Sequence, residues 1–176
     1  MERNTIVIDA CLAITFGNAQ LLKLLTGLRL HRVAIARRAL DEVTGPPAKE
    51  QLELAISQGA ILPEAVDLSV PAEQEALSRF DARGAFRGRG DAEVLALAVA
   101  RGWLVGSDEV AVQRAAVDEI GVARVAGTLD FLRWAVAENR LHLEDALAVL
   151  QSLDVGLGLL RLIEARGEKL EDVLGP

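Results

Sequence analysis

The sequence predicts an α/β protein with a central parallel sheet of about five strands, flanked by helices and followed by C-terminal helices. Short β-type runs alternate with longer helical patterns, which is typical of a parallel sheet covered by helices. The first run, Thr5–Asp9, is apolar up to its final acid, as in a strand buried on both faces. The 176 residues, 51% of them hydrophobic, suffice for one full core.

Strands are expected where short runs rich in Val, Ile, Leu and Ala lie between turn residues or acids. Four such runs follow the first one. The further strands are expected at Arg32–Ala36, within Ala60–Val66, at Trp103–Gly106 and at Val122–Ala126.

Helices are expected between the strands, where apolar residues recur at helical spacing. Pro46–Pro47 opens one helix, Gly59 ends it, and the next begins with a Ser69 cap and Pro71 in its first turn. Residues 1–140 should form the main domain, and 141–176 a helical extension packed on it. One helix after the second strand is expected to carry Arg37, Arg38, Asp41 and Glu42. The other helices are expected through Ala19–Leu25 and over Ala48–Gln58, Asp67–Phe80, Gly90–Arg101, Asp108–Ile120, Thr128–Glu138, Leu143–Leu153 and Leu157–Ala165.

The charge balance excludes a tight, nonspecific binder of nucleic acid. Lys and Arg number 19 against 26 Asp and Glu, giving a net charge of −7 and a pI near 4.9. Aromatic residues make up 3% of the chain, so stacking of bases on an aromatic platform is not expected. Any nucleic acid must be bound by a local basic strip and metal ions.

The remaining composition predicts a cytoplasmic protein with no membrane partner. Cys11 is the only cysteine, which excludes an intramolecular disulfide and a cysteine-built zinc site. No apolar run approaches the roughly 18 residues that span a bilayer, and the N-terminus lacks the pattern of a secretory signal.

Four acids stand near strand ends or helix starts, where ligands gather in an open α/β sheet. Asp91 and Asp108 also suit helix caps, and Glu42 suits a solvated helix surface. Asp9 differs, because an acid that ends a wholly apolar strand needs a partner such as a metal ion. The four candidate site residues are Asp9, Glu42, Asp91 and Asp108.

An ordered series of motifs resembles the PIN-domain ribonucleases. The segments are IVIDACLAI, AQLLKLL, VAIARRALDEVT, GRGDAEVLALAVARG, LVGSDEVAVQRAA and, at residues 125–132, VAGTLDFL. Each motif alone is weak, but their order and spacing are maintained from about residue 5 to residue 140. The resemblance implies a PIN-like nuclease domain over 1–140.

The resemblance also implies an RNA endonuclease that uses one or two Mg²⁺ or Mn²⁺ ions. Asp9, Glu42, Asp91 and Asp108 match the acidic positions of the family. Glu93 and Glu109 stand nearby, as secondary ligands or as solvated helix residues. The family often has Ser, Thr or Asn shortly after the first Asp, where this chain has Ala10 and Cys11.

Oxygen ligands alone suit hard cations such as Mg²⁺, which activate water and neutralise charge on a phosphate. No histidine base is then needed, and we interpret His31 and His142 as surface or boundary residues. Two carboxylates ~4 Å apart repel by roughly 4 kcal/mol at an effective dielectric near 20. An acidic cluster therefore favours a bound cation.

Arginines come in two stretches, and the second is the candidate for contact with RNA phosphates. One surrounds the second strand, with Arg29, Arg32, Arg37 and Arg38, and the other precedes Asp91, with Arg79, Arg83, Arg87 and Arg89. The Gly-rich segment Asp81–Gly90 is expected to be a loop that positions the RNA backbone; the alternative is a solvated loop. The candidate substrate-binding residues are Arg83, Arg87, Arg89 and Arg114.

Other functions fit less well. The chain lacks a G-x-G-x-x-G motif and a P-loop, which disfavours a dinucleotide-binding or nucleotide-binding domain. A phosphoacceptor domain would need paired N-terminal acids and a late lysine. A non-catalytic PIN-fold binding or scaffold protein stays the main alternative. The expected partners are RNA, a second copy in a homodimer and, for the toxin of a toxin–antitoxin pair, an antitoxin.

Overall fold

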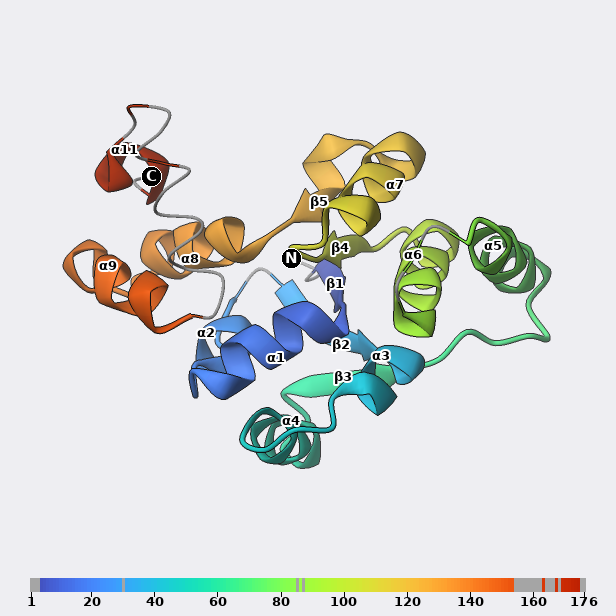
Figure 1. The fold of residues 1–176 in the computed structure, drawn as a ribbon, viewed down its shortest axis with the longest axis horizontal. Helices are drawn as coiled ribbons and strands as arrows, with labels where there is room; N and C mark the ends of the chain where they lie inside the picture. Colours follow the sequence, from blue (N-terminus) through green and yellow to red (C-terminus); the bar gives the residue numbers. More distant parts are fainter. Residues whose placement is uncertain are drawn as a thin grey trace.

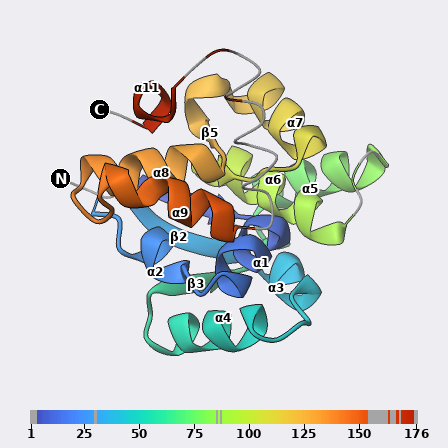
Figure 2. The same cartoon turned by 60° about the vertical axis from the view of Figure 1, so that its left-hand side comes forward.

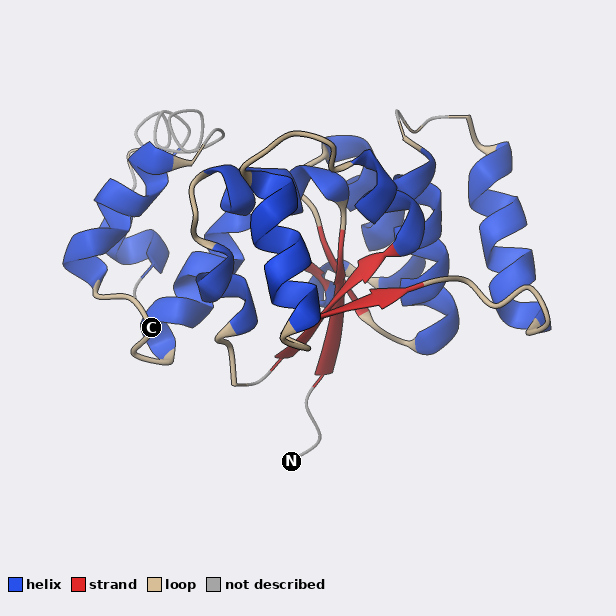
Figure 3. Cartoon of the chain, turned by 90° about the horizontal axis from the view of Figure 1, so that it is seen from below, coloured by secondary structure: helices blue, strands red, loops and turns tan. Residues whose placement is uncertain are grey.

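The computed structural model describes residues 4–29, 31–84, 86, 88–153, 163, 167 and 169–174. Its centre is a five-stranded parallel sheet between helices (Figures 1 and 3), which confirms the expected fold class. The strands lie in the order β3-β2-β1-β4-β5. Their bounds are β1 (Asn4–Ile8), β2 (His31–Ala36), β3 (Ile61–Glu64), β4 (Leu104–Gly106) and β5 (Val125–Ala126).

Strand β1 lies in the middle of the sheet, where a strand must be apolar on both faces. Ile6, Val7 and Ile8 are accordingly fully buried. Ile8 pairs with Ile35 of β2 on one side and with Gly106 of β4 on the other. The chain runs outward from β1 to β3 and then returns to β4 and β5, so the strand order reverses beside β1. Such a switch point is where open α/β sheets form ligand crevices.

Helices pack in two groups around the sheet (Figures 2 and 3). In one group α1, α2 and α4 contact one another and α8 contacts α2, and in the other α6 packs against α5, α7 and the central strands. The first group is α1 (Ala10–Asn18), α2 (Leu22–Thr26), α4 (Ala48–Ser57) and α8 (Thr128–Ala137). The second is α5 (Pro71–Ala82), α6 (Arg89–Arg101) and α7 (Val110–Ile120), and the short α3 (Arg37–Glu42) packs mainly on α6.

Several expected boundaries were wrong by a few residues. The first helical stretch is two helices, separated where Gln20 adopts a positive φ of 58°. The expected strand Val122–Ala126 begins with a 3₁₀ turn, η1 (Val122–Arg124), and only Val125–Ala126 pairs with β4. Helix α6 begins at Arg89, two residues ahead of Asp91, whose carboxylate was expected to open it. The expected helix Leu157–Ala165 lies outside the described residues, apart from Ile163.

Ser69 does not cap α5, contrary to the sequence interpretation. The cap position is Val70, without a side-chain hydrogen bond, although Pro71 does begin the helix. The backbone N–H and the hydroxyl of Ser69 both donate to Asp67 Oδ1, at 2.9 and 2.6 Å. The Asp67 side chain therefore closes a tight local turn that removes Ser69 from the helix end.

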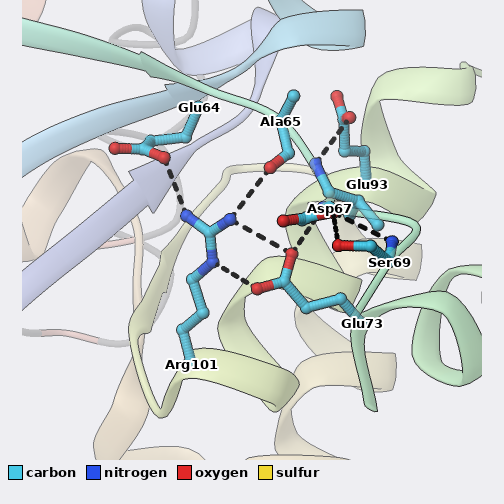
Figure 4. A network of polar contacts seen from close by, with 8 residues as sticks. Glu64, Ala65, Asp67, Ser69, Glu73, Glu93 and Arg101 are labelled. Atoms are coloured by element: carbon cyan, nitrogen blue, oxygen red, sulfur yellow. Dashed lines mark hydrogen bonds and ion pairs between the residues drawn. The ribbon is translucent and has the colours of Figure 1, made fainter. Parts of the chain in front are cut away.

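Arg101 fixes the connection between β3 and α5 from the last turn of α6 (Figure 4). Its guanidinium donates to Glu64 at 2.7 Å, to Glu73 at 2.8 and 3.1 Å and to the carbonyl of Ala65 at 2.9 Å. Glu73 in turn accepts the N–H of Asp67 at 2.7 Å. This half-buried network joins α6 to the far edge of the sheet.

The C-terminal part packs on the main body where it is described. Helices α9 (Leu143–Ser152) and α11 (Leu170–Leu174) contact each other, and α11 contacts α8. Leu150 and Leu174 are fully buried, and the Arg133 guanidinium of α8 donates to the carbonyl of Val173 at 2.7 and 2.9 Å. No helix in the described part of the chain has the length and apolar character needed to cross a bilayer.

Helices α3 and α6 approach so closely at Gly90 that a side chain does not fit there. A Cβ placed on Gly90 would lie 2.7 Å from the Ala39 Cα and 2.9 Å from its Cβ. Both obstructing atoms belong to a backbone or to a stiff alanine, so they cannot rotate away. This contact sets the distance between the helices that carry Glu42 and Asp91.

We expect Gly90→Ala to lower the free energy of unfolding by about 1–3 kcal/mol, the usual cost of overpacking. Gly45→Ala is the matched control, because nothing lies within 4 Å of the Cβ it would add. Urea unfolding monitored by circular dichroism measures both variants. Equal stability of the two would contradict the close packing of α3 on α6.

Candidate active site

Asp9 is the most buried acid among the described residues, with 1% of its surface exposed. It follows β1 directly, as predicted, and its N–H donates to the carbonyl of Gly106 at 3.0 Å. Its Oδ1 accepts the N–H of Leu12 at 2.8 Å, so Asp9 is the N-cap of α1. Its Oδ2 accepts a short hydrogen bond from the Ser107 hydroxyl. The carboxylate thus links the ends of the two central strands to the start of α1.

Burial is the main cause that raises the pKa of Asp9, to about 7 from an ordinary 3.8. The hydrogen bonds from Ser107 and Leu12 lower this pKa, and the negative charges of Asp91 and Asp108 raise it further. A substantial fraction of Asp9 is therefore protonated at neutral pH. The coupling also shows that these three acids share one region at the carboxyl edge of the sheet.

Asp108 lies between β4 and α7, with its carboxylate held by Thr128 at the start of α8. Oδ1 accepts the Thr128 N–H at 2.8 Å, and Oδ2 accepts the Thr128 hydroxyl at 2.5 Å. The cap of α7 is Glu109, so the interpretation of Asp108 as the cap of its own helix was wrong. The short β5 explains this difference, because it brings Gly127 and Thr128 directly beside the end of β4.

Asp91 and Glu42 meet at the start of α6. Asp91 is 6% exposed and is the third residue of the helix, where its Oδ2 accepts the Gly88 N–H at 3.3 Å. It is not the cap residue, because the helix begins at Arg89 and its cap position is Gly88. Glu42 Oε1 accepts the Gly90 N–H at 2.9 Å, and a Cβ on Gly88 would lie 2.6 Å from the Glu42 carboxylate.

The pKa of Asp91 is raised to about 6. Burial is the largest cause, followed by the negative charge of Glu109. The hydrogen bond from Gly88 lowers the pKa, and the charge of Glu42 raises it. Glu109 thus lies in electrostatic reach of the cluster, close to the place predicted for a secondary ligand.

The two positions after Asp9 contribute no polar group comparable to a serine or asparagine. Ala10 is buried, and the Cys11 thiol lies beside the acids on the first turn of α1. Desolvation raises the pKa of Cys11 to about 11, with further contributions from the charges of Asp9, Asp108 and Glu109. The thiol is therefore protonated at neutral pH and is a poor nucleophile and metal ligand.

The donor chemistry of the cluster fits a hard cation, since its candidate ligands are carboxylate oxygens. Asp91 Oδ1 and Glu42 Oε2 accept no hydrogen bond from a described residue, so they are the most available donors. Among the described residues, however, no group of three His, Cys, Asp or Glu side chains is arranged to hold one metal ion.

Glu93 is neither solvated nor available as a secondary ligand, contrary to both sequence interpretations. It is 4% exposed. Its Oε2 accepts the Arg38 N–H at 2.6 Å, and its Oε1 accepts the Val66 N–H at 3.3 Å. The helical turn places Glu93 on the face of α6 that packs on α3 and on the connection after β3, where free backbone donors need an acceptor.

The predicted arginine track is only partly available. Arg83 forms an ion pair with Glu119 of α7 at 2.5 Å and stacks over Phe80, and Arg79 does the same at 3.1 Å. Arg89 and Arg114 are exposed and make no ion pair with a described residue, whereas Arg87 lies outside the described residues. The charge of Arg83 is thus paired with a carboxylate of α7, unlike those of Arg89 and Arg114.

His31 is not a surface residue. It is 9% exposed at the start of β2, with its ring 4.4 Å from that of Trp134 and its Nδ1 without a hydrogen-bond partner. Burial lowers its pKa, so the ring is neutral at ordinary pH. His142 is exposed, as predicted. Since β2 begins at the opposite end from the acids, His31 is no base for this site.

Two hydroxyl residues were missed by sequence reasoning. Ser107 is fully buried, donates to Asp9 and accepts the Glu109 N–H at 3.0 Å. Thr128, also fully buried, holds both oxygens of Asp108. The available signal was position: Ser107 directly follows β4, and Thr128 begins α8 one residue after β5.

No protein-family model matches the sequence, and no curated protein matches it.

We expect Asp9→Asn to stabilise the protein at pH 8 in EDTA. The pKa of Asp9 is near 4 in the unfolded protein and near 7 in the folded protein. Below pH 4 the acid is protonated in both states and costs no stability; the cost then grows as the pH rises to 7 and is complete above it. Asparagine keeps an oxygen for the Leu12 N–H and removes the charge. Each unit of raised pKa corresponds to about 1.4 kcal/mol of stability regained when the charge is removed. The loss of charge-assisted hydrogen bonds offsets part of this, so the free energy of unfolding should rise by about 1–3 kcal/mol.

Urea unfolding at pH 4, 6 and 8 measures this difference, which should vanish at pH 4. Asp67→Asn is the control, because hydrogen bonds from Ser69 lower the pKa of this exposed acid, so its removal should give no gain at any pH. An Asp9→Asn variant less stable than the parent at pH 8 would show that Asp9 serves the fold chiefly through its bonds.

Proposed function

We propose that this chain is a divalent-metal-dependent endoribonuclease of the PIN type, which hydrolyses RNA phosphodiester bonds at the carboxyl edge of its sheet. The observation that carries the proposal is the position of the buried Asp9 at the switch point of the sheet, close enough to Asp91 and Asp108 that their negative charges raise its pKa. A bound cation would relieve the repulsion among these three acids. The motif series that resembles the PIN ribonucleases supports the same activity.

Asp9, Asp91, Asp108 and Glu42 would hold Mg²⁺ or Mn²⁺, one ion or two. A divalent ion bound there would supply a water activated for attack and would neutralise charge on the phosphate. The chain itself contributes orientation: Ser107 and Leu12 fix Asp9, Thr128 fixes Asp108, and Gly90 fixes Glu42. The four candidate metal ligands include no histidine, so the proposed mechanism needs no histidine base.

RNA would be bound by the cations that no ion pair occupies. Arg89 begins α6 two residues before Asp91, and Arg114 lies on α7, one to two turns after Asp108. Both are exposed. We assign the phosphate contacts to these two, together with Arg87, and assign Arg83 to the fold.

The proposal extends to the setting of the enzyme. We propose a cytoplasmic homodimer that serves as the toxin of a toxin–antitoxin pair, with an antitoxin protein as its inhibitor. Exposed apolar side chains are available for protein contacts, including Val110 at 57%, Val122 at 74% and Leu147 at 45% exposure. Light scattering gives the oligomeric mass directly.

A second candidate is a binding or scaffold protein that keeps the fold without the activity. Both carboxylate oxygens of Asp9 and of Asp108 already accept hydrogen bonds within the protein. Together with the missing three-ligand group among the described residues, this pattern favours acids that serve the fold. Metal binding separates the two candidates.

In Mg²⁺ or Mn²⁺ the purified protein should cleave a mixed pool of single-stranded RNA, and EDTA should stop it. Asp9→Asn, Asp91→Asn and Asp108→Asn should each slow cleavage by a factor on the order of 100 or more, because each removes charge that a cation requires. Asp145→Asn, an exposed acid at the start of α9, is the purification-matched control. Equal cleavage by all variants, or with chelator present, would favour the scaffold function.

Arg89→Ala together with Arg114→Ala should weaken RNA binding similarly for every sequence and reduce the salt slope by about 1–2. Arg83→Ala should leave the slope unchanged and lower stability slightly, because its charge is paired with Glu119. Fluorescence anisotropy with labelled RNA at several salt concentrations measures both. A slope that changes only in the Arg83 variant would reverse the assignment.

A further inference from the structure

The helix that carries Glu42 cannot cap its own N-terminus. Helix α3 has only six residues, and its cap position is Ala36, which has no side-chain acceptor. A helix this short is not stable alone, and its first N–H groups need partners from elsewhere. The orientation of Glu42 therefore depends on what holds α3 from outside.

Helix α6 holds α3 at both ends. At the beginning, Glu93 Oε2 accepts the Arg38 N–H at 2.6 Å. At the end, Glu42 accepts the Gly90 N–H from the first turn of α6 at 2.9 Å. Between these bonds Gly90 lies directly against Ala39. Each helix thus satisfies a backbone donor in the first turn of the other through a glutamate.

We infer that Glu93 is a positioning residue for the acidic site. Glu93 lies on α6, two residues after Asp91, and caps α3; in this way it fixes Glu42 of α3 relative to Asp91. This inference rests on the proposed function for its effect on cleavage, although the geometric coupling itself does not. Glu93 touches neither substrate nor metal in this role, because both its oxygens are used by backbone N–H groups and it is 4% exposed.

Glu73 is a close structural match without the link to α3. It is 7% exposed, accepts the backbone N–H of Asp67, and contacts Arg101 of the same helix α6 (Figure 4). Glu93 reaches the same connection through Val66. Only Glu93 also reaches α3, so a comparison of the two separates general loss of stability from displacement of Glu42.

The experiment measures amide hydrogen exchange by NMR and Mn²⁺-dependent RNA cleavage in Glu93→Ala, Glu93→Gln and Glu73→Ala. Glu93→Ala should speed exchange at the Arg38 and Gly90 amides by about tenfold or more, and should slow cleavage by about 10- to 100-fold. Glu93→Gln should retain most of the slow amide exchange and most of the cleavage rate, because the glutamine side-chain oxygen can still accept the Arg38 backbone N–H. Glu73→Ala should leave exchange at both amides unchanged.

An unaltered exchange rate of the Gly90 amide in Glu93→Ala would overturn the inference. The inference would also fail if Glu73→Ala speeded exchange at Gly90 as much as Glu93→Ala does. Equal loss of cleavage in Glu93→Gln and Glu93→Ala, with normal exchange, would assign Glu93 a role through its charge instead. If the parent protein cleaves no RNA, the proposed function fails while the exchange data still decide the positioning. If Glu93→Ala does not fold, hydrogen exchange in the parent protein decides. The inference then requires that the Arg38 and Gly90 amides exchange with the same free energy of opening, and different opening free energies would refute it.

Discussion

The structure depends on a carboxylate held inside the protein at the end of its central strand. Asp9 is excluded from water, yet its two oxygens bind the start of α1 and the end of β4. Removing an acid from water is expensive unless hydrogen bonds or a partial return of the proton compensate. Both happen here, since the pKa of Asp9 reaches about 7. The central strands cannot shift without breaking these bonds.

The other acids of this edge follow the same physical rule. Asp9, Glu42, Asp108 and Glu93 each accept a backbone N–H at or near the beginning of a helix, in α1, α6, α8 and α3 respectively. The beginnings of helices carry partial positive charge. Several helix starts therefore converge on one edge of the sheet and let negative side chains gather there. Helix capping and a cation site are compatible uses of the same carboxylates, because each oxygen has two lone pairs.

Much of the fold was readable in the sequence, because the run Thr5–Asp9 is apolar up to its final acid and helices such as α4 have clear end signals. The place of Asp9 directly after a strand was also readable, since it is a local property. The contacts of the acidic side chains could not be predicted from the sequence. Glu93 looked like a surface helix residue because its partners, Arg38 and Val66, lie 55 and 27 positions away. Likewise serine is a residue type that often caps helices, but the Ser69 hydroxyl donates to Asp67 instead. Such competition between neighbours is decided by geometry that one-dimensional patterns do not contain.

The place of β1 in the sheet has a consequence for biosynthesis. Asp9 leaves the ribosome 98 residues before its partner Ser107. The strands that flank β1 are likewise far apart, one beginning at His31 and the other at Leu104. Pairing across such sequence separation is slow, because a long loop must close first. The acidic edge therefore assembles only after Ser107 and β4 have been translated, and a growing polypeptide carries these carboxylates separately until then.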